Sequence, residues 1–195
     1  MNLLTRRAPD HVTIAGARCA IRTDFRVSIR FEQLVTRGDL ADEALVDAVL
    51  SLYYDRPPAD KLAAANAALW FYRCGETAKN AGTVAGQGGS SRKLYDWEFD
   101  AGHVFAAFLA DYGIDLESVE QLHWWKFRAL FEALRADNTI RQIMEYRGTD
   151  ISKLKGEQRR HCERMQQLYA IPVRAAERQK LDTIAAALKS SGRLQ

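Results

Sequence analysis

Apolar residues recur at the three- and four-residue spacing of an α-helix through most of the chain, and this spacing limits the fold most. Three stretches carry it: Leu62, Ala65, Leu69 and Tyr72; Leu94, Trp97, Ala101, Val104 and Phe108; and Val119, Leu122, Phe127, Leu130 and Leu134. Hydrophobic residues make up 47% of the 195, enough for most of the chain to fold. The sequence therefore predicts a mainly α protein with a single helical domain.

The N-terminal region carries a strand signal before the first helix. Two short β-prone runs between residues 11 and 21 flank Gly16, which predicts a small β-hairpin. Residues 25–35 fit two structures, because their apolar side chains alternate as far as Phe31 but also fall on one face of a helix. Asp24 stands where a helix N-cap would, since its carboxylate can accept a backbone N–H. We expect a helix here.

Caps and stop signals predict two further helices between residues 39 and 75. Asp39 can cap the first, and the proline pair 57–58 ends it because proline cannot continue the backbone ladder. Its buried positions would be Leu45, Val49 and Leu52. The second runs from 60 to 74 and ends at Gly75.

Two stretches lack the apolar positions of a core. Glycine and serine crowd into residues 76–92, which predicts a flexible loop. From Ser152 onward the sequence is polar and helix-prone, is interrupted at Pro172, and has few apolar positions. We therefore expect a helical core domain over 1–150 and a basic helical C-terminal arm over 151–195.

The middle of the chain should hold the densest part of the core. A helix is expected over residues 94–108, and Gly113 with Asp115 then offers a stop and a new cap within three residues. So short a connection predicts that the next helix, ending near residue 134, packs antiparallel against the first. A shorter amphipathic helix over 138–146 would follow.

Charge is distributed unevenly along the chain. Residues 93–135 hold four basic and eight acidic residues, a net −4, whereas 147–195 hold eleven basic and five acidic residues, a net +6. These regions could attract each other within one chain or between copies, as in a homo-oligomer. Nucleic-acid binding by the basic end is disfavoured, because glutamates are interspersed and no aromatic residues are placed to stack on bases.

The three cysteines do not suggest a disulfide framework or a zinc site. Cys19, Cys74 and Cys162 are far apart and show no C-x-x-C spacing. His161 beside Cys162 could suggest a thiol nucleophile or a ligand pair, but adjacent helical residues point about 100° apart. We expect this pair to lie on the surface.

Two other motifs have a simple structural interpretation beside a catalytic one. Asp96, Glu98 and Asp100 could form a carboxylate cluster for a metal, yet acids at a helix start also complement the helix dipole. The stretch 86–93 superficially resembles a phosphate loop but lacks the G-x-x-x-x-G-K-[ST] spacing. We expect no metal, no cofactor and no enzyme activity.

The tryptophan pair is the sharpest feature of the sequence. Trp124 and Trp125 are adjacent, and on a helix adjacent side chains diverge, so one of them would face a partner or another copy. A dense core between two layers is the alternative. His123 precedes them on or near an apolar stripe, where a core or interface position is commoner than a base.

Four sequence motifs of this chain together resemble those of a known protein family. They are YDWEFDAGHVFAAFLADYGIDL over 95–116, LHWWKFRALF over 122–131, IRQIMEYRGTDI over 140–151, and Thr23-Asp-Phe-Arg near the start. Together they resemble the "gene product fifteen" family of long-tailed bacteriophages. The resemblance covers nearly the whole chain, and the His-Trp-Trp-Lys-Phe run is its most specific part.

The resemblance implies a protein encoded among tail-morphogenesis genes that acts as a tail-assembly chaperone in the host cytoplasm. Such a chaperone keeps the tape-measure protein soluble while tail-tube protein polymerises around it, and no catalytic residues are implied. No signal peptide or apolar stretch of about 18 residues suggests export or membrane insertion. The alternatives are a structural tail or head-completion component and, third, a nucleic-acid-binding protein. The expected protein-contact residues are His123, Trp124, Trp125, Phe127, Leu168 and Leu181.

Overall fold

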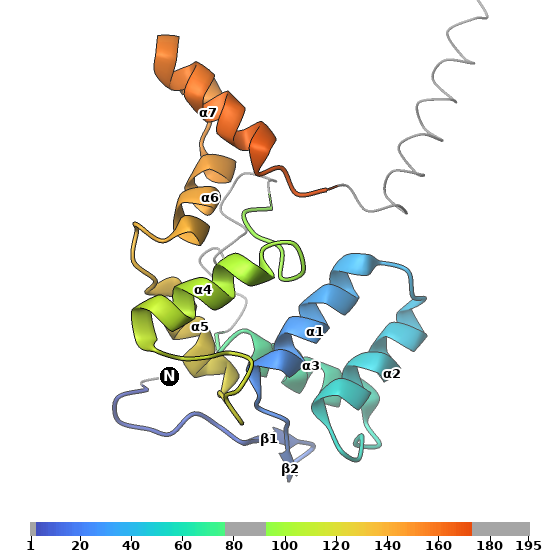
Figure 1. Ribbon diagram of the computed structural model, residues 1–195. Coiled ribbons are helices and arrows are strands. Elements are labelled where there is room, and N and C mark those ends of the chain that lie inside the picture. Colours follow the sequence, from blue (N-terminus) through green and yellow to red (C-terminus); the bar gives the residue numbers. More distant parts are fainter. Residues whose placement is uncertain (1–2, 77–92, 173–195) are drawn as a thin grey trace, which may run out of the picture. The chain divides into compact units, whose positions relative to one another are not determined.

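The computed structural model describes residues 3–76 and 93–172 (Figure 1). Helices dominate it and a short antiparallel hairpin precedes them, which confirms the predicted fold class. The elements are β1 (His11–Ile14), β2 (Ala17–Ala20), α1 (Phe25–Arg37), α2 (Asp42–Tyr53), α3 (Lys61–Tyr72), α4 (Ala101–Tyr112), α5 (Trp124–Glu132), α6 (Thr139–Gly148), the 3₁₀ turn η1 (Ile151–Lys153) and α7 (Gly156–Leu168). The chain divides into two compact units, Met1–Gly148 and Thr149–Gln195.

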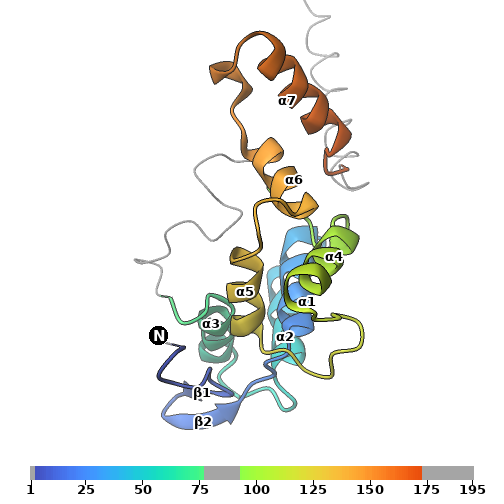
Figure 2. The same cartoon turned by 60° about the vertical axis from the view of Figure 1, so that its left-hand side comes forward.

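The hairpin forms where the sequence predicts it. β1 and β2 pair in the register that places Ile14 opposite Ala17. Ala15 and Gly16 connect them with φ angles of 48° and 81°, and two positive φ values are the geometry of a type I′ turn. Val12 and Ile14 are buried, and β1 lies next to α3 (Figure 2). This packing supports a hairpin that would be marginal alone.

α1 is a helix rather than a strand, as expected. Asp24 caps it, because the Asp24 carboxylate accepts the backbone N–H of Arg26 at 3.0 Å, and Gly38 ends it in the left-handed conformation. Phe25 and Phe31 point into the core. The apolar spacing of residues 25–35 fits both a strand and a helix, and the local cap at Asp24 favours the helix.

Two details of the next helices differ from the predictions. α2 begins at Asp42 after Ala41, so the prediction that Asp39 caps it is wrong. α3 begins after Asp60 as expected, but it buries Ala64, Ala68 and Phe71 and leaves Leu62 73% exposed. The prediction was wrong for Leu62, whereas Ala65, Leu69 and Tyr72 are partly buried against the core. This helix is apolar on most sides, so spacing alone does not fix its rotation.

α4 and α5 begin later than predicted. Residues 93–100 are irregular, so α4 starts at Ala101, although Gly113 does end it. The Asp115 carboxylate accepts the backbone N–H groups of Glu117 and Ser118 in a turn rather than at a helix start, and α5 starts at Trp124. The short antiparallel connection was therefore a wrong prediction. The Arg26 guanidinium holds the intervening loop through the carbonyls of residues 116 and 119, a contact invisible in local sequence.

Aromatic side chains fill the core of the first unit. The Phe127 ring stacks on Phe25 of α1 at 4.7 Å and on Phe108 of α4 at 4.8 Å between ring centroids. It also contacts Trp97 and Phe131. Stacked and edge-to-face pairs add to the free energy gained by burial, so this cluster stabilises the arrangement of α1, α4 and α5.

The second unit contains η1 and α7. The Asp150 carboxylate caps η1 by accepting the backbone N–H of Ser152, and the Gln166 side chain donates to the Thr149 carbonyl. Cys162 is buried while His161 is exposed, so the prediction that both lie on the surface was wrong for the cysteine. Most of the predicted loop, 77–92, and the end of the arm, 173–195, lie outside the described residues.

A chain ending at Asp150 should fold and melt at nearly the temperature of the full chain. The reason is that the aromatic core and its polar ties lie within Met1–Gly148. Circular dichroism with a thermal melt measures this. A truncated chain that aggregates, or that melts about 10 °C lower, would show that the second unit contributes to the core of the first.

Candidate functional site

Both members of the tryptophan pair, one of which was expected at an interface, lie in the core. Trp124 is 0% and Trp125 2% exposed. Their indole N–H groups donate to the backbone carbonyls of Tyr72 and Phe71 at 2.7 and 2.8 Å. The end of α3 therefore accepts both side chains, and the dense-core alternative is confirmed. The premise that adjacent helical tryptophans must face different surroundings was wrong.

Gly75 permits this close packing after α3. Its φ of +79° is left-handed, and a Cβ atom there would lie 3.0 Å from the Trp125 ring. Glycine is therefore required by both its backbone conformation and the space available. The stop signal read from the sequence also marks a contact with the core.

His123 acts as a helix cap. Its Nδ1 accepts the backbone N–H of Trp125 at 3.1 Å, so Nε2 carries the proton and donates to the Pro9 carbonyl at 3.1 Å. Burial lowers the pKa of His123 below its usual 6.5, partly opposed by the bond to Pro9. Both ring nitrogens are used in holding the start of α5.

The other predicted contact residues differ in exposure. Phe127 is completely buried, whereas Leu168 is 65% exposed at the end of α7. Leu181 lies outside the described residues. Phe127 therefore belongs to the core of the first unit, as the two tryptophans do, and does not offer a contact surface.

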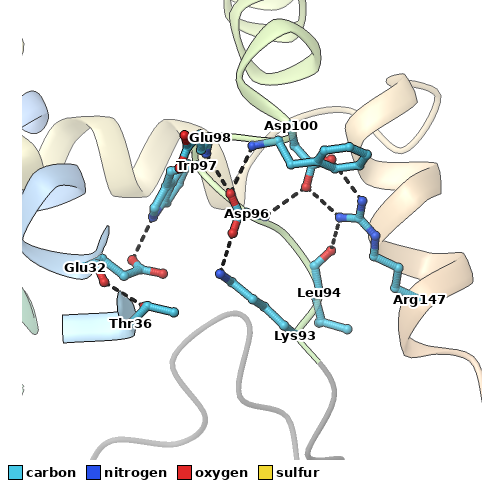
Figure 3. Close-up of polar contacts among 10 residues, drawn as sticks. Glu32, Thr36, Lys93, Leu94, Asp96, Trp97, Glu98, Asp100 and Arg147 are labelled. Atoms are coloured by element: carbon cyan, nitrogen blue, oxygen red, sulfur yellow. Dashed lines mark hydrogen bonds and ion pairs between the residues drawn. The ribbon is translucent and has the colours of Figure 1, made fainter. Parts of the chain in front are cut away.

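A buried ion pair joins the start of α4 to α6 (Figure 3). The Arg147 guanidinium donates to both oxygens of the Asp100 carboxylate, at 2.6 and 2.9 Å, and to the Leu94 carbonyl at 2.9 Å. The Asp100 carboxylate also accepts the backbone N–H of Asp96. Only 1% of the Asp100 side chain and 6% of the Arg147 side chain are exposed, so the pair depends on these hydrogen bonds.

Asp96 and Glu32 complete the polar ties of residues 93–100 (Figure 3). Burial would raise the pKa of Asp96, but hydrogen bonds from Lys93 and from two backbone N–H groups lower it to about 2. The Glu32 carboxylate of α1 accepts from the Trp97 indole at 2.7 Å and from the Tyr72 hydroxyl at 2.8 Å. These acids organise the fold, and within residues 3–76 and 93–172 no group of three or more His, Cys, Asp or Glu could hold a metal ion.

An open groove of about 460 Å³ lies between α1 and α2. Its apolar lining comes from Leu34, Ala48 and Leu52, and the leucines are partly buried against the core. Polar residues complete the lining: Arg30, Gln33, Arg37 and Ser51. An apolar floor with a polar rim is the usual composition of a protein-binding site. The sequence missed it because the groove exists only once the two helices pair.

Comparison with known families gives one match. A model of the family described as Bacteriophage Gp15 protein matches residues 4–171. No curated protein and no solved structure matches the chain. Among the helices described here, none is long and apolar enough to cross a membrane.

Replacing Asp100 by asparagine should destabilise the protein by about 3–5 kcal/mol, because Arg147 would remain buried without its counter-charge. Urea unfolding followed by tryptophan fluorescence measures this. The double variant Asp100→Leu with Arg147→Met should be closer to the wild type. Breaking the Arg159–Glu163 pair of α7 with Glu163→Gln is the control and should change stability little. A small loss in Asp100→Asn would contradict the structural role of the pair.

The melting temperature should fall as the pH is lowered from 7.5 to 5.5. The folded pKa of His123 is below 6.5, so the unfolded chain binds more protons, and this contribution to stability is present above about pH 6.5 and lost below it. His123→Asn keeps a cap acceptor without titrating and should flatten the dependence. His103→Asn removes an exposed histidine and should leave the slope unchanged. An unaltered slope in His123→Asn would contradict this assignment.

Proposed function

Because the chain belongs to the bacteriophage Gp15 protein family, whose model matches residues 4–171, we propose that it is a tail-assembly chaperone that binds the tape-measure protein during tail morphogenesis. The match is the observation that carries the proposal. The resemblance adds that members are encoded among tail-morphogenesis genes. We further propose that the protein works in the host cytoplasm by contact with its partner, without catalysis or a cofactor.

The surface of the first unit suits this role. A chaperone for a long apolar chain needs an accessible apolar surface that is small enough to stay soluble without the partner. The groove between α1 and α2 offers such a surface, since three of its lining side chains are apolar and the others are polar. This groove replaces the tryptophan pair as the proposed contact site in the first unit, since the indoles are needed in the core.

Co-expression with the neighbouring tape-measure protein tests the proposal. We expect the tape-measure chain to copurify with this protein and its soluble yield to rise several-fold over expression alone. Expression with the Asp100→Asn variant is a control for folding, because a destabilised chaperone should recover less partner. A chain ending at Asp150 tests the arm, whose proposed contacts at Leu168 and Leu181 predict a lower yield.

Two outcomes would contradict the chaperone role. The first is a tape-measure protein that remains insoluble or separate while this chain is folded and abundant. The second is this chain as a stoichiometric component of purified virions, which would instead identify a structural tail or head-completion protein. Detection by mass spectrometry of purified particles distinguishes the two roles.

A further inference from the structure

We infer that the groove between α1 and α2 binds an amphipathic helix of the partner whose apolar stripe is flanked by acidic residues. The inference rests on the proposed function in taking that partner to be the tape-measure chain. It identifies the chemistry of the bound segment, which neither the family match nor the resemblance supplies.

The lining residues repeat along both helices. Arg30, Leu34 and Arg37 occupy one face of α1, because they are separated by four and three residues, and Gln33 lies beside them. Ala48 and Leu52 are one turn apart on α2. Two packed helices therefore present a leucine from each wall, which is the surface that a third helix contacts with its own apolar stripe.

The rim of the groove is basic. Arg30 and Arg37 are exposed, and none of the described residues that line the groove is acidic. Elsewhere the guanidinium of Arg22 is paired with Asp55 and that of Arg147 with Asp100. In the described part of the chain the side chains of Arg30 and Arg37 make no hydrogen bond or ion pair, so both charges can meet acids of a partner.

The spacing of the two arginines defines the bound segment. Seven helical residues advance about 10 Å along the axis, which is two turns. A helix lying along α1 would therefore place acids seven residues apart opposite Arg30 and Arg37, with apolar side chains between them over Leu34 and Leu52. The end of this chain is a poorer electrostatic match, because residues 173–195 contain five basic and two acidic residues.

A partner helix that contacts only about two turns of α1 should bind weakly and reversibly. Interfaces much smaller than about 1,200 Å² are typical of transient complexes. A weak site suits a long chain that must be released, and several copies of this protein could then occupy successive helices. Charge complementarity would select acidic helices and speed their association.

A designed helical peptide tests the chemistry directly. The probe has leucines at three- and four-residue spacing and glutamates seven residues apart beside them, and its matched control carries lysines in place of the glutamates. Fluorescence anisotropy should show the glutamate peptide binding at least about tenfold more tightly, with a preference that declines as salt is raised. Equal binding of the two peptides, or binding of neither, would overturn the inference.

Charge reversal in the protein provides the reciprocal test. The variant R30E/R37E should lose at least about tenfold in affinity for the glutamate peptide and should gain affinity for the lysine peptide. R160E/R164E changes two exposed arginines of α7 by the same total charge and should bind like the wild type. Thermal melts check that both variants fold. If R30E/R37E does not fold, the neutral variant R30Q/R37Q takes its place and should also bind the glutamate peptide more weakly. An R30E/R37E variant that binds normally would overturn the site.

Cross-linking locates the partner itself. A photo-reactive residue at Gln33 in the groove should cross-link to the copurified tape-measure chain, whereas one at the exposed Gln142 of α6 should not. Copurification with cross-links only outside the groove would overturn this inference and leave the proposed function standing. Failure to copurify would contradict the proposed function, while peptide binding would still report on the groove. If R30E/R37E instead dissolves a wild-type dimer, the occupant is a second copy and the inference fails.

Discussion

The ring of Phe127 is the contact on which the first unit depends. It stacks between Phe25 and Phe108 at centroid distances of 4.7 and 4.8 Å, with interplanar angles of 13° and 12°. One side chain of α5 therefore fixes the positions of α1 and α4, which are far apart in sequence. Because interiors are closely packed, a smaller side chain would leave a cavity that several helices would have to fill. Because Phe25 belongs to α1, this stacking also positions the wall of the groove that α1 forms.

Backbone pairing reinforces the stack. The N–H of Phe25 donates to the Leu122 carbonyl at 2.9 Å, and the N–H of Trp124 donates to the Thr23 carbonyl at 2.7 Å. The caps Asp24 and His123 thus lie opposite each other at the starts of α1 and α5. Two motifs that carry the family resemblance, Thr23-Asp-Phe-Arg and the His-Trp-Trp-Lys-Phe run, meet at this point. They mark the interior of the fold rather than a contact surface.

Local signals predicted much of the fold, and long-range contacts account for what they missed. The Asp24 and Asp60 caps and the Gly113 stop act within a few residues, so the sequence displays them. The irregular segment 93–100 depends on Arg147 and Glu32, which are distant in sequence. The same holds for the groove, since periodicity can place Leu34 on a face of α1 but cannot say which helix lies beside that face.

The residues of α1 that pack in the core and those that line the groove lie on different faces of the helix. Phe25 and Phe31 are buried in the aromatic core, whereas Arg30 and Arg37 extend along the groove without polar partners among the described residues. Substitutions of the arginines therefore leave the core contacts intact, since surface changes away from packed features alter stability little. Changes at Asp100 or Phe127 act on the fold first and on binding only through it. This separation lets loss of a binding surface be distinguished from loss of a folded protein.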